Sequence, residues 1–264
     1  MCEHNAHPQV VLLQEAFTGD AKAIAQQAGY RHMAIGPQHA PAADAAPLGE
    51  NFAGAARWDR GELSENLLDS GLMILSDYPI VRSRSFAFPQ GACAGFDCLA
   101  AKGVIIAWIA VPDAAQPIAI INTHLNSRRS THVTSERADR AYAWQMDAIR
   151  RLISANVVDE TPVIFGGDFN AGEAPRRVAA LAHPLLGDLE QDGLATALSR
   201  QGTNNSARDE TLHILKRNKD KLLSRNGSRV TLAPRHVSVP FRVLSPTAPL
   251  SDHAGFAIVY AMGG

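Results

Sequence analysis

Short apolar runs in this chain are each followed soon afterwards by polar side chains that can do chemistry. The runs at residues 10–13, 118–121 and 163–165 are rich in Val, Ile and Leu, which predicts buried strands. The polar residues that come after them are Glu15, His124, Asp168 and Asn170. Strand ends in α/β proteins open onto a shared crevice, so these side chains are expected to converge. The pattern therefore favours a fold that gathers several strand ends in one place.

Helical and strand-like segments alternate along the rest of the chain. Helical spacing of apolar residues predicts helices at 20–28, 135–156 and 174–182. Apolar runs predict further strands at 71–75, 104–111, 222–232 and 256–262. A Pro-containing break between 104–111 and 118–125 favours a hairpin there. We expect one α/β domain over residues 1–264 with mixed sheets, and a long surface excursion rich in Ala, Pro and Gly at 36–61.

Composition excludes some classes of protein. The chain has 264 residues, with 25 Lys and Arg against 26 Asp and Glu. A formal net charge of -1 argues against a protein that coats nucleic acid through positive charge, while local contacts with nucleic acid stay open. No run reaches the roughly 18 apolar residues of a membrane span, and no signal peptide is visible near Met1. We expect a monomer without stable membrane insertion, and the compartment stays open.

The three cysteines, Cys2, Cys93 and Cys98, are too few for a disulfide framework. Cys93 and Cys98 lie five positions apart and either bridge a loop or stay reduced. Two reduced thiols are the expectation favoured here. Because no other soft ligand lies near them in the sequence, the pair is a poor candidate for a zinc site.

The polar residues at the predicted strand ends share a preference for hard cations and phosphate. The oxygen ligands are Glu15, Asp168, Asn170 and Asp252, and such ligands suit Mg²⁺ or Mn²⁺ better than zinc or copper. The imidazoles His124 and His253 supply an acid, a base or a donor to a developing oxyanion. Together these groups fit metal-assisted hydrolysis of a phosphoric ester. Taken singly, each residue also fits a solvated strand end or a turn.

Five short motifs occur along the chain, and their order is informative about the protein family. They are Leu13-Gln14-Glu15, Gly71 to Ser76 with Tyr78-Pro79-Ile80, Asn122-Thr123-His124-Leu125, Gly167-Asp168-Phe169-Asn170, and Ser251-Asp252-His253. In this order they resemble the endonuclease/exonuclease/phosphatase superfamily of metal-dependent phosphoesterases. The resemblance covers about residues 9–260. Each motif is weak alone, and the specificity comes from their joint order and spacing.

The resemblance implies a four-layer α/β sandwich of two packed mixed sheets flanked by helices. It also implies roles. Glu15 and Asp252 are then metal ligands; Asp168 orients or deprotonates the attacking water, and Asn170 helps to hold the phosphate. His253 contacts the scissile phosphate and pairs with Asp252, while His124 stabilises negative charge. The family's aspartate before a late hairpin matches Asp220, which also fits an ordinary charge in the surrounding Lys/Arg/Asp run.

One departure from the family pattern concerns the first strand. Family members usually begin with a strand that carries an asparagine close to the metal. This chain has no strand-like run before residue 9, and Asn5, with Pro8 close behind, lies outside one. The resemblance therefore implies a sandwich that lacks its first strand, a start upstream of Met1, or a site that works without that asparagine.

Two features bear on the substrate. Residues 96–104 resemble a loop and strand of neutral sphingomyelinases, in which an aspartate and a lysine five positions apart lie near the active site; Asp97 and Lys102 have that spacing. An ordinary loop aspartate and strand-entry lysine are the alternative. For nucleic acid, basic residues that could contact a phosphodiester backbone are Arg128, Arg129, Lys216, Arg217, Lys219, Lys221 and Arg225. No stacking aromatics are interleaved with them.

Three hypotheses stay open at this point. The first is an Mg²⁺- or Mn²⁺-dependent phosphodiesterase that uses an activated water on a nucleic acid or a sphingomyelin-type phospholipid. The second is a phosphomonoesterase on a small or inositol-type phosphate. The third is a catalytically impaired binding protein on the same fold, favoured by the missing asparagine. A serine hydrolase is rejected because the chain has no Gly-x-Ser-x-Gly elbow.

Overall fold

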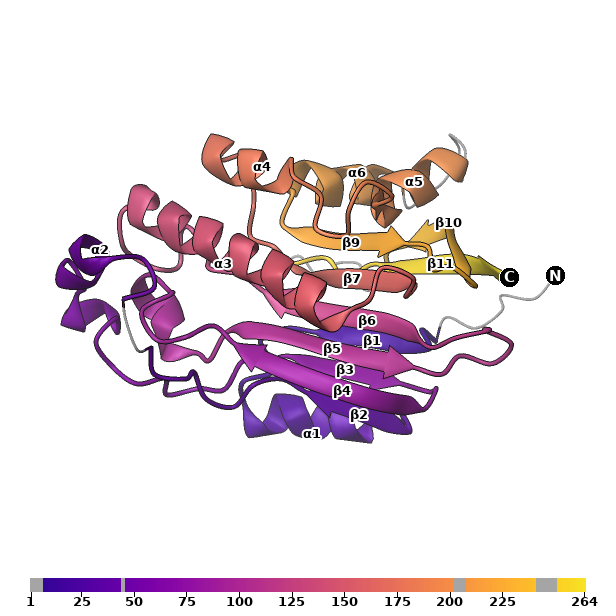
Figure 1. The fold of residues 1–264 in the computed structure, drawn as a ribbon, viewed down its shortest axis with the longest axis horizontal. Coiled ribbons are helices and arrows are strands. Elements are labelled where there is room, and N and C mark those ends of the chain that lie inside the picture. Colours follow the sequence, from indigo (N-terminus) through magenta and orange to yellow (C-terminus); the bar gives the residue numbers. More distant parts are fainter. Residues whose placement is uncertain (1–6, 44–45, 202–207, 241–250) are drawn as a thin grey trace.

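The fold stacks four layers in the order helix, sheet, sheet, helix (Figure 1). The computed structural model describes residues 7–43, 46–201, 208–240 and 251–264. Helix α1 (Gly19–Gln27) lies outside a three-stranded sheet, and α3 (Ser135–Asn156) lies outside a six-stranded sheet. The inner faces of the two sheets pack together. The predicted four-layer α/β sandwich is confirmed. Asn5, which was considered in connection with the family's first strand, lies outside the described residues.

The six-stranded sheet is mixed and has the order β4-β5-β6-β7-β9-β8. Its strands are β4 (Ile80–Ala87), β5 (Gly103–Ile109), β6 (Ile118–His124), β7 (Val163–Asp168), β8 (Gln191–Asp192) and β9 (Asp220–Arg225). Strands β5 and β6 form the predicted antiparallel hairpin, and β6 runs parallel to β7. Every residue of β5 and β6 is buried. Their apolar runs are continuous because both faces of these strands are covered.

The facing layer consists of two antiparallel sheets. One contains β1 (Val10–Leu13), β2 (His32–Ile35) and β3 (Met73–Ser76) in the order β1-β3-β2; the other pairs β10 (Thr231–Ser238) with β11 (Ala257–Gly263). Ile74 of this layer and Ile105 of the six-stranded sheet are both 0% exposed in a shared apolar core. Burial of such side chains contributes about 25 cal/mol per Å² of apolar surface, which holds the two layers together.

The helices cover the outer faces through apolar stripes. Helix α3 has the predicted bounds; Thr134 caps its first turn, and its buried stripe includes Tyr142 and Ile149. The remaining helices are α4 (Pro175–Leu181), α5 (Gly193–Arg200) and α6 (Arg208–Arg217). Helices α5 and α6 pack against β10 and gather beside β9 (Figure 1). No helix within the described ranges is long and apolar enough to cross a membrane.

The strand predicted over 222–232 is wrong as a single element. Strand β9 ends at Arg225 and β10 begins at Thr231, with Asn226 and Gly227 in the turn between them. Asn and Gly favour turns, and here the Asn226 side chain accepts a hydrogen bond from the Leu232 amide. The turn divides the apolar run, so its two halves join different sheets.

The excursion at 36–61 packs back onto the domain. It contains α2 (Glu50–Gly54) and the 3-10 helix η1 (Trp58–Arg60). Phe52 is 4% exposed and packs against Ala138 of α3, whereas Trp58 is 80% exposed. The segment is therefore anchored by one aromatic side chain, while other parts of it face solvent.

Cys93 and Cys98 form a disulfide, so the expectation of two reduced thiols is wrong. The 3-10 helix η2 (Gly95–Leu99) turns the chain between them and brings their Cα atoms to 5.3 Å, a separation that a disulfide spans. The bridge closes the loop that carries Asp97. The spacing alone did not reveal this turn.

Candidate active site

The ends of three neighbouring strands bring the predicted polar residues side by side. In the sheet register His124 of β6 pairs with Asp168 of β7, and Asp168 pairs with Asp220 of β9. Gly167 permits this close approach, because a Cβ atom there would lie 2.1 Å from the Thr123 carbonyl oxygen. The convergence expected from the sequence pattern is thus present in the strand register.

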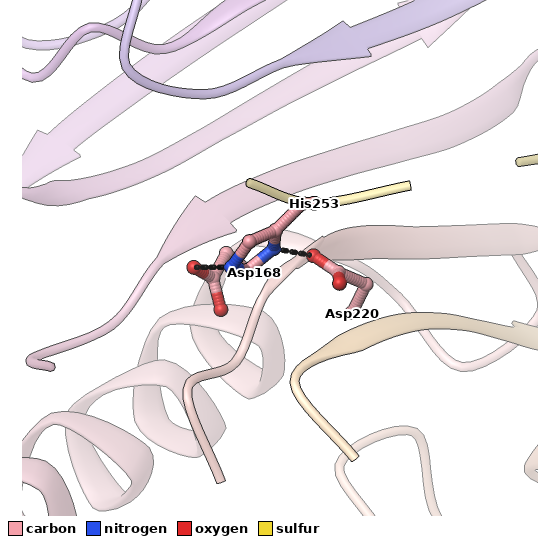
Figure 2. Close-up of side chains that lie close together, drawn as sticks. All are labelled: Asp168, Asp220 and His253. Atoms are coloured by element: carbon pink, nitrogen blue, oxygen red, sulfur yellow. Dashed lines mark hydrogen bonds and ion pairs between the residues drawn. The ribbon is translucent and has the colours of Figure 1, made fainter. Parts of the chain in front are cut away.

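His253 faces this group from the segment before β11 (Figure 2). Its Nδ1 donates a hydrogen bond to Asp220 Oδ1 at 2.8 Å, and its Nε2 lies 3.9 Å from Asp168 Oδ2. The hydrogen bond to Asp220 raises the pKa of His253, partly offset by burial of the ring. Asp220 therefore both orients the imidazole and favours its protonated form.

Asp168 and Asn170 form a tight local arrangement after β7. The backbone amide of Asn170 donates to Asp168 Oδ1 at 2.8 Å, and its side-chain amide donates to Asp168 Oδ2 at 3.1 Å. Burial raises the pKa of Asp168 to about 6, with the negative charge of Asp220 adding to the effect. A carboxylate with such a pKa suits a general base near neutral pH.

Two residues of the site hold strained backbone conformations. Glu15 has a φ of 59° and Asn170 a φ of 49°, both in the left-handed region that favours glycine. Residues other than glycine stay in this region only when their surroundings hold them there, and such residues cluster at active sites.

His124 lies between a lysine and the carboxylates. Lys102 Nζ is 3.1 Å from His124 Nε2 and 2.9 Å from Asp97 Oδ2, and both His124 and Lys102 are buried. Burial, followed by the charge of Lys102, lowers the pKa of His124 well below its usual value. Its Nδ1 has no hydrogen-bond partner among the described residues. A neutral His124 therefore contributes to the site as a dipole and not as a cation.

Glu15 presents an exposed carboxylate to the same group. Its side chain is 63% exposed, and Oε1 lies 3.9 Å from His124 Nε2, while Asp168 Oδ2 lies 3.7 Å from that nitrogen. The Gln14 side chain next to it donates to Asn122 Oδ1 at 2.7 Å, which ties the end of β1 to β6. Glu15 and Asp168 thus approach one point from two sheets.

These donors fit a hard divalent cation. Asp168, Asp220 and His253 each offer a ligand atom, and these atoms lie within 4.8 Å of one another. Because Mg²⁺ and Mn²⁺ prefer oxygen ligands, the carboxylates of Glu15 and Asp168 are the better donors. The buried charge of Asp168 and the solvent-facing charge of Glu15 would both be stabilised by a cation between them. The residues present therefore support a divalent metal site.

The structure changes the position of Asp252. The sequence pairs His253 with its neighbour Asp252, but the imidazole hydrogen bond goes to Asp220. The Asp252 carboxylate is 83% exposed and lies 3.8 Å from His253 Nε2, too far for a hydrogen bond. The chain bends at these two residues, and the Asp252 side chain faces solvent while that of His253 is 19% exposed and faces the strands.

Two of the basic residues considered for nucleic acid have other partners. Arg225 is 8% exposed and donates to the carbonyl oxygens of Leu186, Val158 and Thr161. Lys221 Nζ lies 3.6 Å from Asp192 Oδ2. Arg225 is thus too buried to contact a phosphodiester backbone, and both of its Nη atoms donate to carbonyl oxygens inside the protein.

Two residues of the site, Lys219 and Asn122, were not predicted from the sequence to belong to it. Lys219 Nζ lies 3.4 Å from His253 Nε2, and its position beside Asp220 in the chain could have indicated it. Asn122 is 0% exposed and donates to the carbonyl oxygens of Leu13 and Met73, joining the two sheets beneath Glu15. Asn122 is the first residue of the Asn122-Thr123-His124 motif, and this position could have indicated its role.

Several solved structures share this fold. D. rerio TDP2 complexed with single strand DNA product superposes with a TM-score of 0.60 at 16% identity, over 96% of this chain and 86% of that one. A beta hairpin deletion mutant of beta toxin from Staphylococcus aureus gives 0.58 at 21% identity, over 95% of this chain and 85% of that one. Sphingomyelinase C from Streptomyces griseocarneus gives 0.53 at 19% identity, over 97% and 83%. No curated protein sequence is significantly similar to the chain.

The sequence also matches one protein family across most of its length. The match extends over residues 3–253 and includes the whole group from Glu15 to His253. The sandwich fold and the side chains at its strand ends agree with that match. The chain belongs to the Endonuclease/Exonuclease/phosphatase family.

Proposed function

We propose that this protein is a divalent-metal-dependent phosphodiesterase that attacks phosphorus with an activated water. The observation that carries the proposal is the meeting of His124, Asp168, Asp220 and His253 at one end of the six-stranded sheet. A hydrogen-bonded Asp–His pair, a buried carboxylate of raised pKa and an adjacent lysine together serve the hydrolysis of an anionic ester. Membership of the family supports the same reaction class.

The proposed mechanism gives each side chain one task. Asp168, a buried carboxylate held in place by Asn170, deprotonates or orients the attacking water. Asn170 holds the Asp168 carboxylate in position through two hydrogen bonds and lies where it can also meet the phosphate. His253, whose protonated form is favoured by the hydrogen bond to Asp220, faces the phosphoryl oxygens and stabilises the charge that develops on them.

The metal and the lysine complete the electrostatics. Glu15 would hold Mg²⁺ or Mn²⁺ beside Asp168, with Asp252 in reach of the same region, and the cation would neutralise phosphoryl oxygen charge. Lys102, held between Asp97 and His124, adds a second positive charge at the buried side. Its pairing with Asp97 supports the assignment of both residues to substrate binding.

The substrate class is proposed as a phosphodiester of either a phospholipid or a nucleic acid. The Asp97–Lys102 ion pair, at 2.9 Å, supports a sphingomyelin-type headgroup. Arg128, which follows His124 by four positions in the chain and has a side chain that is 43% exposed, supports a nucleic acid backbone. Among the solved structures that share the fold, one is a sphingomyelinase C and another is TDP2 with a single strand DNA product.

Release of p-nitrophenol from bis-p-nitrophenyl phosphate tests the reaction class. We expect turnover with Mg²⁺ or Mn²⁺ and none after chelation with EDTA, and p-nitrophenyl phosphate should be a poorer substrate. Parallel assays on sphingomyelin vesicles and on plasmid DNA then separate the two substrate sources. Absence of turnover with both metals on all four substrates would refute the proposed function and favour a binding protein.

A further inference from the structure

A fully buried arginine lies directly behind the active site. Arg177, in the first turn of α4, is 0% exposed. Its guanidinium makes one ion pair and three hydrogen bonds to backbone carbonyl oxygens: Nε to Asp139 Oδ1 at 2.6 Å, Nη1 to Asn126 O at 2.7 Å and Asn170 O at 2.8 Å, and Nη2 to Ser127 O at 3.2 Å. The group is also stacked over the Tyr142 ring at 4.5 Å.

The carbonyls that Arg177 holds belong to the two loops that leave the active-site strands. Asn126 and Ser127 follow His124 at the end of β6, and Asn170 follows Asp168 at the end of β7. Strands β6 and β7 are parallel neighbours, so their loops diverge from one edge. The Arg177 guanidinium therefore joins the two loops through three carbonyl oxygens. Asn170 Nδ2 adds a direct hydrogen bond to the Leu125 carbonyl oxygen at 3.1 Å.

The link to Asn170 reaches the proposed base. Asn170 holds a φ of 49° and is fixed from both sides, because its carbonyl accepts from Arg177 while its amide donates to Asp168. Without the Arg177 bond the left-handed backbone of Asn170 would lose a restraint that holds it against strain. The two hydrogen bonds that orient Asp168 would then loosen with it.

The buried charge is supported from α3. Asp139, 7% exposed, supplies the counter-ion, and it also lies 3.5 Å from the exposed side chain of Arg128. A lysine at position 177 would keep the charge but lacks the planar fork that reaches three directions at once. The arrangement therefore requires a guanidinium. Arg177→Lys, which keeps the positive charge and removes the planar group, is a conservative substitution that tests this requirement.

We propose that Arg177, held by Asp139, is a positioning residue that keeps the His124 loop and the Asp168–Asn170 segment in their productive arrangement. Its catalytic consequence rests on the proposed function, whereas its effect on the two loops does not. It acts through Asn170 and touches no reacting atom. The residue lies outside the five sequence motifs that resemble the family.

Arg225 provides a matched control. It is also a buried arginine that donates to three backbone carbonyls, with an exposed aspartate, Asp159, 3.6 Å away. It pairs in the sheet with Val163 at the opposite end of β7 from Asp168. Removal of its planar fork should therefore destabilise the same sheet without disturbing the site.

The experiment compares Arg177→Lys with Arg225→Lys in the full chain. Misplacement of catalytic groups by about 1 Å costs roughly 10²-fold in rate, so we expect kcat of Arg177→Lys to fall about 10- to 100-fold with KM changed less than about threefold. Arg225→Lys should keep kcat within about threefold. Circular dichroism and thermal melts check that the two variants are folded and comparably stable before their kcat values are compared. Equal losses of kcat in the two variants would overturn the proposal.

Hydrogen exchange measured by mass spectrometry gives a readout that needs no activity. The segment 165–172 should exchange faster in Arg177→Lys and remain protected in Arg225→Lys, where the segment 157–163 loosens instead. If Arg177→Lys fails to fold, Asp139→Asn, which keeps a hydrogen-bond acceptor, should loosen 165–172 in the same way. Unchanged protection of 165–172 in the folded variant overturns the positioning role. A wild-type protein inactive on every phosphate ester would instead refute the proposed function, and the exchange result would still decide the role of Arg177.

Discussion

Asp220 accepts a hydrogen bond from Nδ1 of His253 at 2.8 Å, although 33 residues separate them in the chain. This bond fixes the tautomer and the direction of the ring, so Nε2 faces Asp168. It also raises the pKa of His253, so more of the imidazole is protonated at neutral pH. The pair therefore sets both the geometry and the charge of the proposed phosphate-facing group.

Replacement of His253 and replacement of Asp220 should both reduce turnover, but to different extents. His253→Ala removes a charge-stabilising group and should lower kcat by roughly 10²–10⁴-fold with little loss of fold. Asp220→Asn leaves the ring in place but lowers the pKa of His253, so its loss should be smaller. Activity that needs protonated His253 falls as pH rises through that pKa, and in Asp220→Asn this alkaline limb should move to lower pH.

The pH dependence of kcat/KM measures this shift directly. Asp159→Asn is a matched control, because the Asp159 side chain is 98% exposed and far from His253 along the sheet. Near-normal turnover in His253→Ala, or an alkaline limb that stays in place in Asp220→Asn, would contradict the roles assigned to the pair.

Metal binding should stabilise the protein through Glu15. A ligand that binds only the folded state at 100 times its Kd adds about 2.7 kcal/mol to the free energy of unfolding, so Mg²⁺ or Mn²⁺ should raise Tm in a saturable way. Glu15→Gln removes the exposed carboxylate and should abolish most of that increase. Differential scanning fluorimetry across a metal titration provides the measurement.

The control for this titration is Glu136→Gln, a carboxylate whose side chain is 73% exposed on α3. It should respond to metal as the wild-type protein does. An equal rise in Tm for Glu15→Gln and the wild-type protein would show that Glu15 is not a ligand.

The ion pair between Lys102 and Asp97 allows stability to be separated from function. Both side chains are at least 88% buried, and loss of one partner of a buried pair costs about 3–5 kcal/mol in stability. Lys102→Met should therefore destabilise the protein strongly. Removal of both charges in Lys102→Met/Asp97→Asn should recover part of that loss.

Activity should not recover with stability in the double variant. If Lys102 supplies positive charge to the phosphate, both the single and the double variant lose turnover to a similar extent. Urea unfolding and phosphodiesterase assays on the same preparations test this. Recovery of activity along with stability would assign Lys102 a purely structural role.

The parts of the fold with strong local patterns could be predicted from the sequence. Helix α3 was predicted with its observed bounds because its apolar stripe is long and regular. The convergence of His124 and Asp168 was predictable because both follow apolar runs that become neighbouring strands. Short or turn-divided runs were less informative: β9 and β10 were merged, and β4 was not predicted.

Contacts made by long side chains across the fold could not be read from the sequence. The partner of His253 is Asp220 because two distant segments meet, whereas the family resemblance had implied Asp252. Arg177 has no pattern around it that distinguishes a buried guanidinium from an exposed one beside Arg176. Such residues are identified by the carbonyls they reach, and these depend on the paths of the loops.

The buried carboxylate of Asp168 should make stability depend on pH when metal is absent. Its pKa is raised to about 6 in the folded protein, above the usual value of 3.8, so the folded state holds this proton more tightly than the unfolded state. Stability from this group is therefore present at low pH and is lost as pH rises from about 4 to about 6. A difference of about 2 pKa units corresponds to at most about 3 kcal/mol.

Asp168→Asn removes this titration and isolates its effect. In EDTA, the free energy of unfolding of the wild-type protein should fall relative to that of Asp168→Asn between pH 4 and pH 7. Saturating Mg²⁺ should abolish the difference, because a cation beside Asp168 compensates the charge that burial penalises. Catalysis should be lost in the variant at every pH. Parallel stability curves in EDTA would mean that burial does not disfavour the charged carboxylate, which would contradict the raised pKa of Asp168 in the metal-free protein.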